Sequence, residues 1–275
     1  MSLHGKVACI PGTSRPIGRA IARRFGKRGA SLVLPIFDWP ESIAEMKDEF
    51  TAAGFEFFCL EADLRKEEEI AALATAVKDR FGGVDFLINN IERGGMPIVH
   101  GSYDLPHNKE QWDLELDTTL KAKWLLFHHL HPLMQQRPGG AVVNISSIAA
   151  LLGRSGPAAV FFSDGYSAAN KGIQLFTETW ARQAAPSVRV NELMLGLIRG
   201  RHGEGTRGWV QLTEEQKGEL HDNILLKRTG SPDEVANAVY FLAVEATYCS
   251  GTVLRMDGGF TQGASRVPPL PDGIL

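Results

Sequence analysis

The chain has 275 residues, of which 44% are hydrophobic and 22% are charged. These proportions are typical of one globular domain with a sizeable core and exclude a disordered or fibrous chain. The formal net charge of -3 provides no cationic excess that could release counterions from a phosphate backbone, so we expect no nucleic-acid partner and favour a small or thioester-linked substrate.

Signals for export, membrane insertion and cross-linking are also missing from the sequence pattern. Residues 1–6 contain no apolar stretch followed by a small-residue cleavage site, and no run approaches about 18 uninterrupted apolar residues. The cysteines, Cys9, Cys59 and Cys249, are odd in number and far apart, which argues against disulfides and a zinc site. We therefore expect a cytoplasmic protein with no membrane partner.

Short apolar runs alternate with longer amphipathic segments along the chain. The apolar runs predict strands at residues 7–11, 31–36, 55–60, 86–88, 141–145, 188–194 and 252–256. The amphipathic segments predict helices at residues 17–28, 41–53, 66–81, 112–136, 166–184 and 232–244. This alternation indicates parallel strands joined by right-handed crossovers. We predict an α/β fold with a doubly wound parallel sheet of about seven strands, helices on both faces and a single domain.

Two segments fall outside the alternation. Residues 198–226 include Gly200, Gly203, Gly205 and Gly208 among charged side chains, which is typical of an excursion and not of a crossover; we predict a substrate lid there. Residues 264–275 are rich in proline and are expected to form an extended tail after a domain of residues 1–263.

The first predicted strand is followed by a tight turn that leads into a helix. The turn, Gly12-Thr13-Ser14-Arg15-Pro16-Ile17-Gly18, presents helix N-terminal amides that can bind a pyrophosphate. With Asp63-Leu64 after the third strand and Asn89-Asn90 after the fourth, it closely resembles the short-chain dehydrogenase/reductase family, whose turn is TGxxxGxG. The resemblance covers nearly the whole chain, including residues 228–236 and 250–259, and implies a Rossmann-type fold.

The resemblance also implies which residues bind the nicotinamide dinucleotide. The expected contacts are Gly12, Ser14, Ile17 and Gly18 to the phosphates, Asp63 and Leu64 to the adenine, Asn90 to the adenosine side, and Gly196 and Ile198 to the nicotinamide. Three departures predict weaker binding. Pro11 replaces the usual threonine, Pro16 replaces the middle glycine and removes an amide donor, and Ile91-Glu92 brings a carboxylate near the expected ribose.

Two residues bear on the choice between NADP and NAD. Arg15 stands where NADP-preferring members of the family often carry a cation for the 2′-phosphate, although it can also be a solvated loop cation. Asp38, 20 residues after Gly18, could accept ribose hydroxyls in an NAD enzyme, but we place it about two positions beyond the end of its strand. We favour NADP, with NAD possible.

The family transfers a hydride between the cofactor and a carbonyl, using a tyrosine as acid/base, a lysine, a serine and an asparagine. Ser147 falls at the serine and Tyr166 at the tyrosine of the YxxxK motif. Asn170 stands four residues after Tyr166, and Lys171 five, so two registers are open. In one, Asn170 occupies the lysine position; in the other, a helix distortion turns Lys171 toward the tyrosine.

Further departures concern the relay and the substrate side. Thr119 stands where the relay asparagine is expected. The stretch from Ser147 to Tyr166 is longer than usual, and the surplus at residues 154–165 includes an apolar run, 158–162, suited to a wall, a lid or an oligomer contact. We predict an apolar substrate cavity but no particular substrate.

These residues support two hypotheses. The first is an NAD(P)(H)-dependent oxidoreductase that interconverts a carbonyl and an alcohol through Ser147, Tyr166 and Lys171 or a water. The alternative is a member of the family that binds a dinucleotide or related ligand but has a regulatory, structural or non-redox role. The resemblance implies a homo-oligomer, a tetramer or dimer. Three nearby histidines, His128, His129 and His131, lack a completing carboxylate pair, so no metal is expected.

Overall fold

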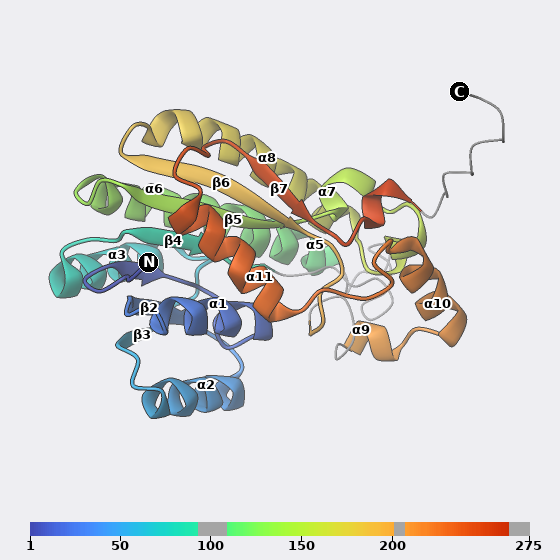
Figure 1. Cartoon of the computed structure of the whole chain (residues 1–275), viewed down its shortest axis with the longest axis horizontal. Helices are drawn as coiled ribbons and strands as arrows, with labels where there is room; N and C mark the ends of the chain where they lie inside the picture. The colour runs from blue at the N-terminus through green and yellow to red at the C-terminus, as the bar shows by residue number, and fades with distance from the viewer. Residues whose placement is uncertain (93–108, 201–206, 264–275) are drawn as a thin grey trace, which may run out of the picture.

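The alternating strands and helices predicted from the sequence form one twisted parallel sheet covered on both faces by helices (Figure 1). The computed structural model describes residues 1–92, 109–200 and 207–263. The seven strands lie in the order β3-β2-β1-β4-β5-β6-β7. Their bounds are β1 Val7–Cys9, β2 Ser31–Ile36, β3 Phe57–Glu61, β4 Phe86–Asn89, β5 Gly140–Ser147, β6 Val188–Leu195 and β7 Val253–Met256. All seven predicted strands and the predicted α/β class are confirmed.

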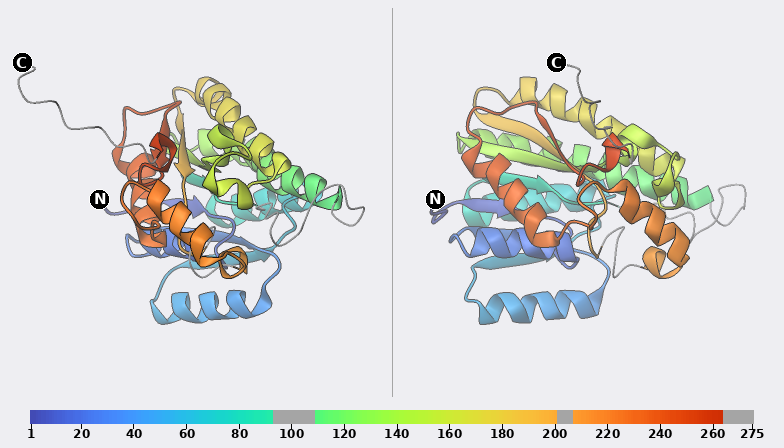
Figure 2. Two further views of the ribbon diagram at one scale, coloured as in Figure 1. Left: turned by 90° about the vertical axis from the view of Figure 1, so that its right-hand side faces the viewer. Right: turned by 45° about the vertical axis from the view of Figure 1, so that its right-hand side comes forward.

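The helices fall into two layers, one on each face of the sheet (Figures 1 and 2). One layer contains α1 (Pro16–Gly26), α2 (Pro40–Ala52) and α11 (Pro232–Tyr240), and its side chains share a core with β1, β2 and β4. The other contains α3 (Glu67–Phe81), α6 (Ala122–Gln135) and α8 (Asp164–Ala184). Both faces of the central strands are therefore buried, which explains their continuous apolar sequence.

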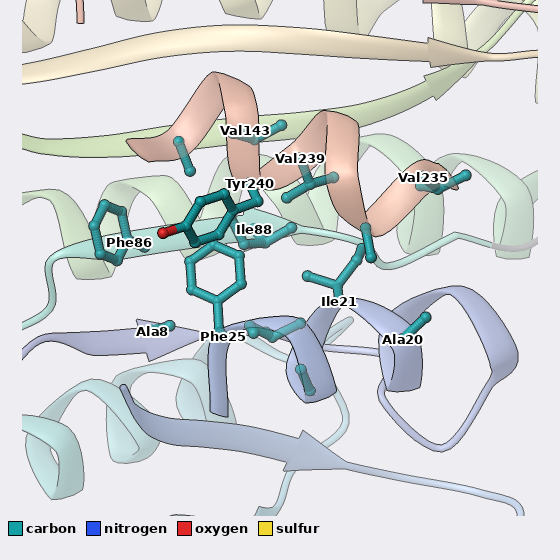
Figure 3. Close-up of a cluster of buried hydrophobic side chains, with 14 of the residues drawn as sticks. Ala8, Ala20, Ile21, Phe25, Phe86, Ile88, Val143, Val235, Val239 and Tyr240 are labelled. Carbon is teal, nitrogen blue, oxygen red and sulfur yellow. The ribbon is translucent and has the colours of Figure 1, made fainter. Parts of the chain in front are cut away.

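Aromatic rings join the first layer to the sheet. Figure 3 shows Phe25 of α1 between Phe86 of β4 and Tyr240 of α11, with ring centroids 5.6 Å and 5.8 Å apart. Both pairs meet edge to face, the arrangement that the ring quadrupoles favour. The Tyr240 hydroxyl donates to the carbonyl of Met1 at 3.0 Å, so the buried phenol keeps a hydrogen-bond partner.

The predicted helix 112–136 is interrupted. It consists of α5 (Lys109–Leu116), the π-helical turn η2 (Asp117–Lys121) and α6, and the predicted helix 232–244 likewise ends in a π-helical turn, η4 (Phe241–Glu245). A π-turn inserts one residue and so changes the face on which the following side chains lie. Because η2 carries Thr119 and directly precedes α6, whose second residue is Lys123, it sets the direction in which these side chains point.

The carboxyl ends of the strands meet short elements from three parts of the chain (Figures 1 and 2). These are α7 (Ala149–Leu152) with the 3-10 turn η3 (Pro157–Val160), α9 (Arg207–Val210) with α10 (Glu214–Asn223), and the 3-10 turn η5 (Phe260–Gln262). The predicted excursion 198–226 thus contains helices, and Thr213 and Gln216 form a capping box that starts α10. The predicted tail 264–275 lies outside the described residues.

Among the described helices, none is long and apolar enough to cross a membrane. The described residues also hold no group of three or more His, Cys, Asp or Glu side chains that could bind a metal ion. Two of the three neighbouring histidines pack against rings instead: His131 stacks on Phe127 at 4.8 Å and His128 on Trp124 at 5.6 Å.

Candidate active site

In the turn after β1, backbone segments approach one another so closely that they leave no room for side chains. Gly12 has φ +71°, and a Cβ there would lie 2.4 Å from the carbonyl oxygen of Asn90. A Cβ on Gly18 would lie 2.3 Å from the carbonyl oxygen of Gly12. The Asn90 amide also donates to the carbonyl of Pro11 at 3.3 Å. Glycine is therefore required at both positions, and Asn90 holds the turn in shape.

The N-terminus of α1 is suited to a phosphate. Its N-cap residue, Arg15, makes no side-chain capping bond, and the first turn contains no acidic residue. The hydroxyl of Thr13 in the turn is buried and has no hydrogen-bond partner in the part of the chain that the structure describes. Ser14, Ile17 and Leu64, three of the predicted contacts, are buried around this end. Unclaimed amides, a spare hydroxyl and the helix dipole fit the pyrophosphate of a dinucleotide, which would supply the hydride when bound.

At the predicted adenine side, Asp63 is bound by Arg65. The guanidinium donates to the carboxylate through Nε at 2.8 Å and through its terminal nitrogen at 2.7 Å. This hydrogen bonding lowers the pKa of Asp63. The ion pair orients the carboxylate at the end of β3.

Arg15 and Asp38 occupy the rim of the same end. The Arg15 guanidinium lies over the ring of Trp39, 4.4 Å from its centroid, and both side chains are exposed. Asp38 is exposed with φ +55° and lies two residues after the last residue of β2, Ile36. Its position confirms the expectation that it stands beyond the strand. Arg15 is stacked on an aromatic side chain and still accessible to a ligand.

Ser147 and Tyr166 are brought to the carboxyl end of the sheet. Ser147 is the last residue of β5, and its hydroxyl accepts from the amide of Ala149 at 3.2 Å. Tyr166 is fully buried in the first turn of α8, in the same apolar cluster as Ile148 and Ala149. The N-cap residue Ser163 accepts from the amide of Tyr166 at 3.2 Å and so positions the tyrosine.

The register after Tyr166 is settled by an uninterrupted α8. Asn170 is buried, and its amide donates to the carbonyl of Tyr166 at 2.9 Å. Lys171 is exposed and donates to Gln174 at 2.9 Å. The helix distortion that would turn Lys171 toward the tyrosine is not found, because α8 keeps regular α geometry from Asp164 to Ala184. The expected catalytic position of Lys171 is therefore wrong, and Asn170 occupies the place of the family's lysine.

A lysine that the sequence interpretation missed lies inside the protein. Lys123, the second residue of α6, is 1% exposed, and its ammonium donates to the carbonyl of Ile145 on β5 at 2.6 Å. The residues around it in sequence, Ala122 to Phe127, are otherwise mostly apolar. The signal available in the sequence was a charged residue within an apolar helical stretch, which indicates a buried charge, and the sequence interpretation did not use it.

Two carboxylates face this lysine. Both carboxylate oxygens of Glu92, just after β4, are buried, and burial raises the pKa of Glu92 to about 7 although Lys123 and Asn170 lower it. Burial lowers the pKa of Lys123 to about 8, opposed by the charges of Glu92 and Glu192. Glu192 on β6 accepts from the hydroxyls of Ser146 and Thr177, and its pKa is raised by burial. Glu92 was noted from the sequence; Glu192 was not.

The substrate side is apolar and joins the two irregular segments. Ala158, Phe161 and Phe162 from the inserted residues 154–165 share a buried cluster with Trp209, Leu212 and Leu220 from the excursion. The rings of Phe162 and Tyr166 lie 6.1 Å apart. The insertion therefore packs against the excursion beside the tyrosine. The predicted nicotinamide border is close-packed as well, since a Cβ on Gly196 would lie 2.6 Å from Cα of Asp257 and Ile198 bridges Gly230.

Comparison with known proteins agrees with this geometry. The family model described as enoyl-(acyl carrier protein) reductase matches residues 12–261. The chain is 34% identical over 266 residues to glucose 1-dehydrogenase 2 of Bacillus subtilis, covering 94% of this chain and 96% of that protein. It is 31% identical over 261 residues to a 3-oxoacyl-[acyl-carrier-protein] reductase of Vibrio cholerae, covering 94% and 98%.

A solved structure shows the same fold over almost the full length. The short-chain dehydrogenase/reductase from Serratia marcescens superposes with a TM-score of 0.80 at 24% identity, covering 95% of this chain and 100% of that one. The relatives are oxidoreductases, which does not favour a purely regulatory or structural role. The chain belongs to the short-chain dehydrogenase/reductase family and is a nicotinamide-dinucleotide-dependent oxidoreductase.

Proposed function

We propose that the protein interconverts a carbonyl and an alcohol on a substrate with an apolar body, using NADP in preference to NAD. Tyr166 acts as the proton donor to the carbonyl oxygen, and Ser147 orients that oxygen. The observation that carries the proposal is the burial of Tyr166 in one apolar cluster with the residues that follow Ser147. A buried acid beside an apolar wall excludes water from the reacting carbonyl.

The cofactor residues proposed from the resemblance are Gly12, Ser14, Arg15, Ile17, Gly18, Asp63, Leu64, Asn90, Gly196 and Ile198. The uncapped start of α1 supports the phosphate contacts. Arg15 supports NADP, because its exposed guanidinium can bind a 2′-phosphate without first breaking an ion pair with an acidic side chain of the described chain. Residues 198–226 act as the substrate lid, and assembly as a homo-oligomer in the cytoplasm remains part of the proposal.

The substrate class is argued from the wall beside the tyrosine. Phe161, Phe162 and Trp209 present large apolar side chains there, which suit an acyl or hydrocarbon body better than the hydroxyls of a sugar. Of the two activities named for the relatives, reduction of a 3-oxoacyl thioester fits this wall better than oxidation of glucose.

The test is nucleotide binding followed by turnover. Purified protein is titrated with NADPH and NADH by fluorescence and then assayed with a 3-oxoacyl N-acetylcysteamine thioester, apolar ketones and glucose. Tyr166→Phe should lower turnover by about 10²- to 10⁴-fold, because a general acid is lost. The control Tyr248→Phe changes a fully exposed tyrosine and should leave turnover unchanged. Absence of binding to both nucleotides, or equal turnover in the two variants, would contradict the proposal.

A further inference from the structure

The place of the family's lysine is filled by an amide in this chain, yet a lysine is buried close by on another helix. Asn170 cannot supply positive charge, and Lys171 points to the surface. Lys123 reaches the interior from the start of α6 and bonds the carbonyl of Ile145. Ile145 is two residues before Ser147 on β5, about 7 Å along a strand. The ammonium therefore lies beneath the end of the strand that carries the serine.

Lys123 is a poor structural residue at this place. An ammonium has three donors, and the described part of the chain provides one hydrogen bond, to Ile145. Its neighbours along α6, Leu125 and Leu126, are fully or almost fully buried, so an apolar side chain could fill the site. Burying an incompletely bonded charge opposes folding, and an apolar replacement often stabilises. Packing alone does not account for a lysine here.

The charged groups that face Lys123 connect it to the tyrosine helix. Glu92 approaches from the end of β4 and Glu192 from β6, while Lys171 acts on Glu192 from the outer side of α8. Asn170 acts on Glu92 by lowering its pKa, and the Asn170 amide donates to the carbonyl of Tyr166. Among the described residues the Oδ1 atom of Asn170 is buried without a hydrogen-bond partner, so this cluster retains hydrogen-bonding capacity for a ligand hydroxyl or a water.

We propose that Lys123, paired with Glu92, supplies from α6 the positive charge that the family's lysine supplies from the helix of the tyrosine. Lys123 is a positioning residue: it acts through Glu92 and Asn170 on the surroundings of Tyr166. The inference rests on the proposed function, since the role of the pair is to support proton donation by that tyrosine. It also explains why a carboxylate and an amide can stand at positions 92 and 170.

The first test compares turnover of Lys123→Met and Lys171→Met. Methionine keeps the length and apolar stem of lysine and removes its charge. Lys123→Met should lower kcat by about 10²-fold with little change in KM, whereas the exposed control Lys171→Met should stay within about twofold. Adding Asn170→Lys to Lys123→Met returns a lysine to the family's position and should recover at least about tenfold. Wild-type kcat in Lys123→Met would overturn the proposal.

The second test uses the pH profile of Glu92→Gln, which keeps the size and polarity of the side chain and removes the negative charge. Because the charge of Glu92 raises the pKa of Lys123, the variant should lose the ammonium proton, and hence activity, at a lower pH than the wild type. An alkaline limb that does not move would contradict the pairing. This variant also serves if Lys123→Met folds poorly.

The third test needs neither cofactor nor turnover. In nucleotide-free protein labelled with ¹³C at the glutamate carboxyl, the signal absent from Glu92→Gln identifies Glu92. Its pKa should rise in Lys123→Met, because a nearby positive charge is lost, and stay unchanged in Lys171→Met. An identical titration in Lys123→Met and wild type would overturn the pair. If the wild type neither binds nucleotide nor turns over, the proposed function fails while this titration still decides the pairing.

Discussion

Replacing Gly18 by alanine tests whether the turn after β1 has the close geometry described. The added Cβ would lie 2.3 Å from the carbonyl oxygen of Gly12 and 2.7 Å from the side-chain amide of Asn90. Carbon and oxygen atoms without a bond do not approach within 3.0 Å, so backbone must move by more than half an ångström. Overpacking of this kind costs about 1–3 kcal/mol, and displacing Asn90 from the carbonyl of Pro11 adds about 1 kcal/mol.

We therefore expect Gly18→Ala to lower the free energy of unfolding by about 2–4 kcal/mol and to weaken NADPH binding. The assay is urea denaturation, read as the midpoint at an unchanged slope. The matched control is Gly218→Ala in α10, where a Cβ meets nothing within 4 Å; it should stabilise the protein by about 0.4–1 kcal/mol. Equal midpoints for Gly18→Ala and wild type would refute the close approach.

Three other changes test the cofactor rim and two structural contacts. Arg15→Ser should raise the Kd for NADPH about tenfold and leave that for NADH within twofold, because the 2′-phosphate that Arg15 is proposed to bind is present only in NADPH. Equal effects on the two nucleotides would exclude this role. Arg228 lowers the pKa of Glu234 to about 2, so Glu234→Gln should destabilise by at most about 1 kcal/mol at pH 7 for this half-exposed pair. That difference should vanish as pH falls from about 5 through 2, and a pH-independent difference would rule out the charge effect. Arg189 donates to the carbonyls of Leu242, Ala243, Ala246 and Cys249; Arg189→Met should lower the urea midpoint by an amount equivalent to about 2–4 kcal/mol, and an unchanged midpoint would show that solvent replaces these bonds.

The order of strands and helices was predictable because every parallel strand is followed by a segment that must cover it. The ends of elements were less so. The first strand ends at Cys9 and not at Pro11, since Pro11 has no amide to donate to the sheet and Gly12 turns the chain with φ +71°. The interruption of the predicted helix 112–136 depends on packing that local sequence does not encode.

The residues of the candidate site likewise divide into those that the sequence predicted and those that it did not. Ser147 and Tyr166 could be placed because the residues around them resemble motifs of the family, and helical periodicity then put Asn170 on the same helix face as the tyrosine. Lys123 was missed: its place in an apolar stretch of α6 was a signal for burial, but helical periodicity does not show which groups a buried lysine meets. The role proposed for Lys123 depends on Glu92, which is 31 residues away in sequence.

The loss of a catalytic side chain in a sequence motif is therefore weaker evidence against activity than it first suggests. A proton-transfer site requires a charge at a particular position, and side chains from several helices or strands can reach one buried position. In this fold, α6, the end of β4 and α8 surround the same interior region, so a lysine on α6 can supply there the positive charge that the family's lysine supplies from α8. In the family's usual arrangement, a buried carboxylate at position 92 and an amide in place of the lysine at position 170 would each be unfavourable. Both are compatible with the ammonium of Lys123, which reaches this region from α6. Because the carboxylate at position 92 and the amide at position 170 make chemical sense beside the buried ammonium of Lys123, the cluster as a whole argues for a working active site and against an inactive one.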